Sequence, residues 1–188
     1  MSDDRPVHAD HRVQHRYPAD VRFCALCGGE MRPREVLPDR KRFKVCARCG
    51  FVDFPSPKLV AGCLVVERGN VLLLKRGIEP ALGRWTFPGG YVDLGEHPKD
   101  AAVREVAEEV YMGVRAGDLL GVYFAPSNPI AVIVVYLAEP GSNPPSVSDE
   151  ATEVGYYEAS AIPWDDLAFD TTRQALSDWV ARERSGGS

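Results

Sequence analysis

The stretch that decides the fold runs from Gly89 to Met112 and reads GGYVDLGEHPKDAAVREVAEEVYM. Its first part belongs to a glycine-rich loop that starts at Phe87 and continues to Glu96. Its second part predicts a helix that begins near Pro98, because proline is tolerated in a first helical turn whose N–H groups have no partner. At 3.6 residues per turn, one face of this helix is apolar and carries Val103, Val106, Ala107 and Val110.

The opposite face of the predicted helix carries Glu105, Glu108 and Glu109. Three carboxylates at this spacing repel one another at neutral pH, and a hard divalent cation with oxygen ligands relieves that repulsion. Taken alone, such a pattern is more often the solvated face of an ordinary amphipathic helix. The residues around it decide between the two interpretations.

The three glutamates are part of a longer pattern of fixed spacing. Gly90 is followed by five residues and Glu96, then by seven residues and Arg104, and Glu105 comes next. The whole pattern resembles the signature of the Nudix hydrolases, G-x5-E-x7-R-E-U-x-E-E-x-G-U, in which U is a bulky aliphatic residue. One position departs from it, since Tyr111 stands where the family has its last glycine. We expect the helix to continue to Met112 and Gly113 to end it, because a side chain disfavours the left-handed conformation.

The resemblance implies an α/β/α sandwich around a mixed sheet and an enzyme that hydrolyses phosphoanhydride bonds. It implies Mg²⁺ or Mn²⁺ as cofactor, held by the three glutamates with help from the Gly90 carbonyl. By the same analogy, Glu96 pairs with Arg104 and holds the loop against the helix. The general base stays open between a glutamate of the helix and one on a later loop, where Glu150 and Glu153 are the candidates.

Two Cys-x-x-Cys pairs lie near the start of the chain and are formed by Cys24, Cys27, Cys46 and Cys49. Two such pairs, each followed by a glycine, predict a ribbon with one structural Zn²⁺. We expect these glycines to take a positive φ. The fifth cysteine, Cys63, lies in an apolar run and is predicted to be a buried core thiol.

Basic residues gather between the two cysteine pairs, at Arg32, Arg34, Arg40, Lys41, Arg42 and Lys44. Two interpretations stay open for them. They contact phosphates, or they solvate a small ribbon and offset the charge of the zinc tetrathiolate.

Length, composition and charge limit the class of protein and the cellular compartment that we expect. With 188 residues, 45% of them hydrophobic, the chain can form one domain with a small appendage. A net charge of −5 argues against a nucleic-acid binder that acts by bulk electrostatics. The first twenty residues lack an apolar segment typical of a signal peptide, and the longest apolar run, Ile130–Ala138, is too short to span a bilayer. We therefore expect a cytoplasmic protein without a membrane partner.

The predicted organisation is a disordered tail at 1–20, a zinc ribbon at 21–55, a catalytic domain at 56–184 and a flexible tail at 185–188. Within the large domain, strands are predicted at Leu59–Val66, Val71–Lys75, Asp118–Ala125, Ile130–Ala138 and Val154–Glu158. A hairpin turn is predicted at 67–70 and a last helix at Asp170–Glu183. Three aromatic residues are candidates for stacking on a base, although core packing explains them equally well: Trp85, Tyr123 and Phe124.

A second segment, residues 161–169, resembles one that recurs in the zinc-ribbon Nudix hydrolases of bacteria and plant plastids. That resemblance implies FAD and ADP-ribose as substrates and AMP as a product. NADH is the alternative substrate, but the segment typical of NADH pyrophosphatases does not follow Met112. Two other classes stay open, a non-catalytic regulator that binds a nucleotide and a zinc-ribbon module that binds nucleic acid. Many Nudix pyrophosphatases are dimers, so the resemblance is also compatible with a homodimer.

Overall fold

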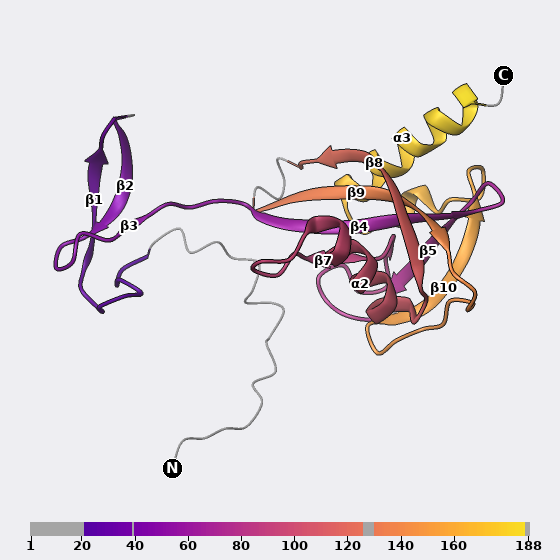
Figure 1. Cartoon of the computed structure of the whole chain (residues 1–188), viewed down its shortest axis with the longest axis horizontal. Coiled ribbons are helices and arrows are strands. Elements are labelled where there is room, and N and C mark those ends of the chain that lie inside the picture. The colour runs from indigo at the N-terminus through magenta and orange to yellow at the C-terminus, as the bar shows by residue number, and fades with distance from the viewer. Residues whose placement is uncertain (1–20, 39, 126–129, 187–188) are drawn as a thin grey trace, which may run out of the picture. The chain divides into compact units, whose positions relative to one another are not determined.

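The computed structural model describes residues 21–38, 40–125 and 130–186 and divides the chain into two compact units, 1–56 and 57–188 (Figure 1). The predicted tail at 1–20, residues 126–129 and the last two residues lie outside the described part. None of the helices in the described part has the length and apolar character needed to cross a membrane.

The first unit contains a three-stranded antiparallel sheet in the order β1-β2-β3, formed by β1 (Met31–Val36), β2 (Lys41–Cys46) and β3 (Val52–Asp53). Its small core consists of Cys24, Met31 and Cys46. The glycine after each cysteine pair has a positive φ, 69° at Gly28 and 75° at Gly50, as predicted.

The second unit is built on one seven-stranded sheet, with the order β10-β5-β4-β9-β8 and two short strands beside it. The strands are β4 (Lys58–Glu67), β5 (Asn70–Arg76), β6 (Trp85–Thr86), β7 (Gly89–Tyr91), β8 (Val114–Tyr123), β9 (Ala131–Pro140) and β10 (Ala151–Glu158). Strands β4 and β9 run parallel and the other pairs are antiparallel, which confirms the predicted mixed sheet. The helices are α2 (Pro98–Val110), α3 (Asp170–Gly186) and the short 3-10 helix η1 (Trp164–Asp166).

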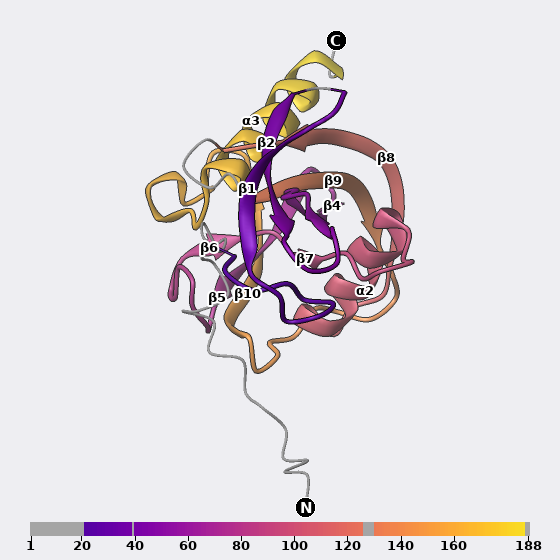
Figure 2. The ribbon, with the colours of Figure 1, turned by 90° about the vertical axis from the view of Figure 1, so that its left-hand side faces the viewer.

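Helices α2 and α3 cover opposite faces of this sheet (Figures 1 and 2). Successive residues of a strand point to opposite faces, so Cys63 packs in the cluster that contains Val106 of α2. Its neighbour Leu64 packs in the cluster that contains Leu176 and Trp179 of α3. Burial raises the pKa of the Cys63 thiol to about 12, and the prediction of a core thiol is confirmed.

The predicted hairpin is confirmed, since β4 and β5 join through a two-residue turn in which Arg68 and Gly69 both have positive φ. Three predicted boundaries were wrong. The glycine-rich loop contains strand β7, β8 begins four residues before Asp118, and β10 begins at Ala151 rather than at Val154. The first four residues of β8 were missed because the alternation of the strand is interrupted at residues 117–119, which are all exposed and where the register with β9 shifts.

The predicted end of α2 was also wrong. The helix ends at Val110, and Tyr111 takes the left-handed conformation, with φ 51° and ψ 32°. The side-chain amide of Asn143 donates to the Tyr111 carbonyl (2.6 Å), and its oxygen accepts from the Gly113 N–H (3.2 Å). Met112 is then buried beneath the sheet, with 1% of its surface exposed. These contacts offset a backbone strain of about 1–2 kcal/mol, so the turn keeps its conformation without the glycine.

Candidate active site

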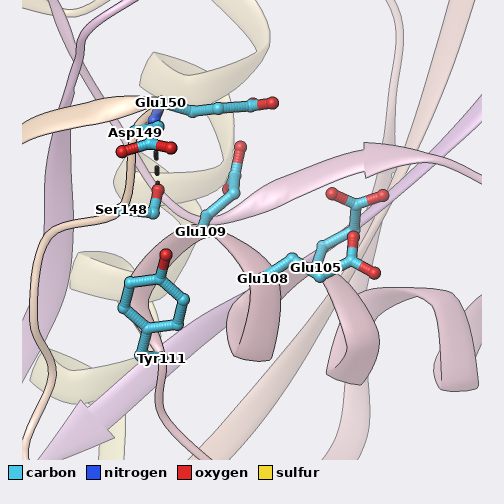
Figure 3. A pocket seen from close by; sticks show the side chains of 7 residues that line it. All are labelled: Glu105, Glu108, Glu109, Tyr111, Ser148, Asp149 and Glu150. Atoms are coloured by element: carbon cyan, nitrogen blue, oxygen red, sulfur yellow. Dashed lines mark hydrogen bonds between the residues drawn. The ribbon is translucent and has the colours of Figure 1, made fainter. Parts of the chain in front are cut away.

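A pocket of about 180 Å³ lies at the outer face of α2 (Figure 3). Four lining residues come from the end of the helix and three from the loop before β10: Glu105, Glu108, Glu109, Tyr111, Ser148, Asp149 and Glu150. Five of the seven carry a carboxylate, so the pocket has the donor set of a hard cation.

The three glutamates of α2 are not equivalent. Glu109 is 8% exposed, and its carboxylate accepts a hydrogen bond from the Gly89 N–H at 2.9 Å. Burial raises the pKa of Glu109 to about 8 despite this bond. Burial also raises the pKa of Glu105, whereas the side chain of Glu108 is 58% exposed. The protein surroundings of the pocket therefore oppose ionisation of its innermost carboxylate.

The carboxylate of Glu105 approaches the backbone closely at Gly90. A Cβ atom at Gly90 would lie 2.5 Å from the carboxyl carbon and both oxygens of Glu105. No side chain fits there without displacing that carboxylate. Strand β7 thus holds the loop directly against α2.

Arg104 binds the loop to the helix as predicted. Its Nε and Nη2 donate to the two carboxylate oxygens of Glu96, both at 2.9 Å, and Nη2 also donates to the Tyr91 carbonyl. Its Nη1 donates to Glu105 (2.8 Å) and to Glu108 (3.0 Å). The Arg104 guanidinium lowers the pKa of Glu96 to about 2. One cation therefore fixes the loop and orients two of the pocket's carboxylates.

The structure places the two candidate general bases, Glu150 and Glu153, in different surroundings. Glu150 lines the pocket, and Figure 3 shows the carboxylate of Glu109 directed toward the side where Glu150 lies. The backbone carbonyl of Glu150 accepts a hydrogen bond from the Gly77 N–H at 2.7 Å, and this bond fixes the loop to the end of β5. Glu153 lies inside β10, opposite Lys75, and pairs with that ammonium at 2.7 Å, outside the pocket lining.

The sequence model of the NUDIX domain family matches residues 56–182. The chain belongs to the NUDIX family. Its pocket is formed by the residues of the Nudix signature, together with the loop before β10.

Similar proteins agree with this assignment. The crystal structure of a NUDIX hydrolase from Nitrosomonas europaea superposes with a TM-score of 0.80 and 31% identity, covering 89% of this chain and 94% of that one. An ADP-ribose pyrophosphatase from Methanocaldococcus jannaschii is 32% identical over 56% of this chain and 64% of its own length. The NAD-capped RNA hydrolase NudC of Pseudomonas aeruginosa is 29% identical over 89% of this chain and 58% of its own length. The chain thus spans about three fifths of the length of these two curated relatives.

The Nudix pocket also has neighbours that sequence reasoning missed. Ser148 and Asp149 line it, and no local pattern marks them; Tyr111, which the sequence marked only as a departure from the signature, lines it as well. Arg76, at the end of β5, donates to the Pro80 carbonyl at 2.7 Å. Burial lowers the pKa of Arg76, and the charges of Glu109 and Glu150 partly offset that effect. Arg76 is therefore a cation close enough to interact with two carboxylates of the pocket.

None of the three aromatic candidates lines the Nudix pocket. Trp85 is 9% exposed and packs edge-on against Tyr157, with ring centroids 5.1 Å apart. Tyr123 is 6% exposed, and its hydroxyl donates to Asp178. Core packing accounts for both rings. Phe124 is 49% exposed.

The four cysteines ahead of the Nudix domain converge. Their sulfurs all lie within 4.8 Å of one another, with Cys24 and Cys49 3.7 Å apart and Cys27 and Cys46 3.5 Å apart. Four sulfurs placed tetrahedrally at about 2.3 Å from Zn²⁺ would lie about 3.8 Å apart. The Cys49 N–H donates to the Cys46 sulfur and lowers the pKa of that thiol to about 6. The set fits a zinc ion.

Proposed function

We propose that this protein is a Mg²⁺-dependent pyrophosphohydrolase that cleaves nucleoside diphosphates linked to another moiety. FAD and ADP-ribose are the proposed substrates and AMP the common product. The observation that carries the proposal is the pocket of about 180 Å³, whose lining brings the three glutamates of α2 together with Glu150 as a set of oxygen donors.

The residues present fit a divalent cation. Glu105, Glu108 and Glu109 would hold it, with the Gly90 carbonyl beside Glu105. A buried carboxylate such as Glu109, with its pKa raised to about 8, gains most from a nearby cation because burial penalises its ionised form. When bound, Mg²⁺ or Mn²⁺ would neutralise the negative charge of the diphosphate and would lower the pKa of a coordinated water.

The chain's own residues have separate roles in this proposal. Arg104 holds the Glu105 and Glu108 carboxylates in place through hydrogen bonds of 2.8 and 3.0 Å, and Glu96 anchors Arg104. Glu150 is the proposed general base, since it lines the pocket and forms none of the ion pairs of the described residues. It accepts a proton as water attacks phosphorus and the bridging P–O bond breaks. ADP-ribose then yields AMP and ribose 5-phosphate, and FAD yields AMP and FMN.

The substrate class rests on two kinds of support. The relative from Methanocaldococcus jannaschii is named for ADP-ribose, and residues 161–169 resemble the group associated with FAD. The NudC relative favours a second candidate, a substrate with a nicotinamide dinucleotide, either NADH or an NAD cap on RNA. The complete set of glutamates argues against a regulator without catalytic activity.

A hydrolysis panel tests the proposal. FAD, ADP-ribose, NADH, NAD-capped RNA and diadenosine tetraphosphate are compared at saturating Mg²⁺ and Mn²⁺, with release of AMP as the readout. A kcat/KM for NADH or for the capped RNA at least tenfold above both FAD and ADP-ribose would replace the substrate and leave the reaction class intact. Glu108→Gln should lower kcat by roughly 10²-fold or more, as expected for loss of a catalytic metal ligand. Near-normal turnover of that variant would refute the metal assignment.

The general base is tested with a matched pair of variants. Glu150→Gln should lower kcat by roughly 10²–10⁴-fold and remove the acidic limb of the pH–rate profile. Glu153→Gln removes the same charge from a nearby position of β10 and breaks only the exposed pair with Lys75, so its kcat should stay within a few-fold of wild type. The opposite ranking would assign the base to Glu153.

A further inference from the structure

We propose that one face of the ribbon sheet binds single-stranded nucleic acid, a function separate from hydrolysis at the Nudix pocket. This cationic face consists of Arg32, Arg34, Lys41, Phe43 and Phe54. It lies wholly within the first unit.

The strand register sorts charges between the two faces of the ribbon. Residues directly opposite in an antiparallel pair share a face. Arg34 is opposite Phe43, and Lys41 is opposite Val36. The two acidic residues of the strands lie on the other face, where Glu35 is opposite Arg42 and Asp53 is opposite Lys44. Within the described strands, the cationic face therefore has no carboxylate.

Two cations of this face are available to a ligand. Arg32 forms an exposed pair with Glu30 at 2.8 Å. Among the described residues, Arg34 and Lys41 have no ion-pair or hydrogen-bond partner, and both are exposed. Their guanidinium and ammonium groups can bind phosphates without first losing an internal partner.

An aromatic pair lies on the same face. The rings of Phe43 and Phe54 are 4.9 Å apart at an interplanar angle of 61°. Phe54 is 61% exposed and lies outside the ribbon core around Met31. Phe43 is half-buried and supports the exposed Phe54 ring. An exposed ring beside cations is the arrangement that stacks bases while the backbone phosphates are neutralised. An acidic peptide would need the cations but not the rings.

The distribution of charge along the chain supports a polyanionic partner for the ribbon alone. Residues 21–56 carry eight Lys and Arg against four Asp and Glu, a net charge of +4. Residues 57–188 carry 11 against 19, a net charge of −8. A zinc tetrathiolate would lower the net charge of the ribbon by two. This negative charge would lie at the cysteines and not on the cationic face. The overall charge of −5 therefore conceals a basic unit joined to an acidic one.

The test uses the zinc-loaded full chain and a fluorescent 12-nucleotide single-stranded RNA without terminal phosphates, in Mg²⁺-free buffer. Binding is measured by anisotropy as a function of salt, and retained zinc is measured for each variant. Arg34→Ala/Lys41→Ala should weaken binding at least tenfold and reduce the slope of log K against log salt by about 1.4, or 0.7 per lost phosphate contact. Arg115→Ala/Arg184→Ala removes the same charge from exposed sites of the second unit and should change neither. Equal losses in both double variants would overturn the proposal.

Phe54 separates stacking from simple attraction of anions. Phe54→Leu should weaken RNA binding several-fold, and Phe54→Trp should retain it. Zinc content and hydrolysis of ADP-ribose should match wild type in both variants. Competition by polyglutamate as effective as that by single-stranded RNA, or equal affinity for duplex RNA, would refute base stacking on this face.

Discussion

Replacing Glu109 by glutamine should abolish most of the loss of stability that the metal-free protein undergoes between pH 6 and pH 8. Glu109 is buried, and its pKa is raised from 4.5 to about 8. Between these two values the folded state binds about one proton more than the unfolded state. Stability therefore falls as the pH rises through this window, by up to about 1.4 kcal/mol per pH unit.

The size of the effect follows from the same pKa. At pH 6 the protonated carboxyl contributes about 3 kcal/mol relative to the unfolded chain, and at pH 8 less than about 1 kcal/mol. The expected loss is about 2 kcal/mol, which corresponds to roughly 4–8 °C in the melting temperature of a chain of this size. Glutamine has the same shape and can still accept from the Gly89 N–H, but it does not ionise.

The assay is thermal unfolding of the second unit at pH 6, 7 and 8 in Mg²⁺-free buffer. Glu108→Gln is the matched control, because it removes a neighbouring carboxylate that is 58% exposed and should keep the wild-type pH dependence. A melting temperature of Glu109→Gln that falls with pH as steeply as that of wild type would refute the reasoning. Mg²⁺ tests the metal proposal separately. It should stabilise the wild type more at pH 8 than at pH 6, because it binds the ionised form.

Two further predictions concern the ribbon and the end of α2. Cys46→Ser should abolish binding of one Zn²⁺ per chain and destabilise residues 21–56, because metal binding supplies much of the folding energy of a small ribbon; metal analysis showing no zinc in the wild-type protein would contradict this. Tyr111→Gly should be more stable than Tyr111→Ala by about 1 kcal/mol in denaturant unfolding, because only alanine retains a Cβ at φ 51°. Equal stabilities of the two variants would mean that residue 111 is not left-handed in solution.

The sequence alone determined the features that depend on local spacing. A helix repeats every 3.6 residues, so the interval between Arg104 and Glu108 is enough to place both on one face. The interval from Glu96 to Arg104 similarly predicted their pairing, by resemblance to the Nudix signature. Two cysteine pairs, each a local turn, predicted a four-sulfur cluster, and the sulfurs do converge.

Tertiary structure decided what depends on residues distant in the chain. The sequence treats Glu105, Glu108 and Glu109 alike, but tertiary packing buries Glu109 and raises its pKa, although the hydrogen bond from the Gly89 N–H acts in the opposite direction. The sequence offered Glu150 and Glu153 as equals, but the pairing of β10 with β5 places only Glu150 at the pocket.

The conformation of Tyr111 also depends on residues that are distant in the sequence. Local propensity opposes a tyrosine at positive φ, and the helix was therefore predicted to continue beyond it. The hydrogen bonds of Asn143, 32 residues later in the chain, and the burial of Met112 outweigh that propensity. Their energies, of about 1 kcal/mol each, are comparable to the backbone strain, and they come from groups that no local pattern relates to position 111. The conformational preference of a residue depends on its neighbours in the sequence. Burial, and the pKa shift that burial causes, arise only when distant segments pack together.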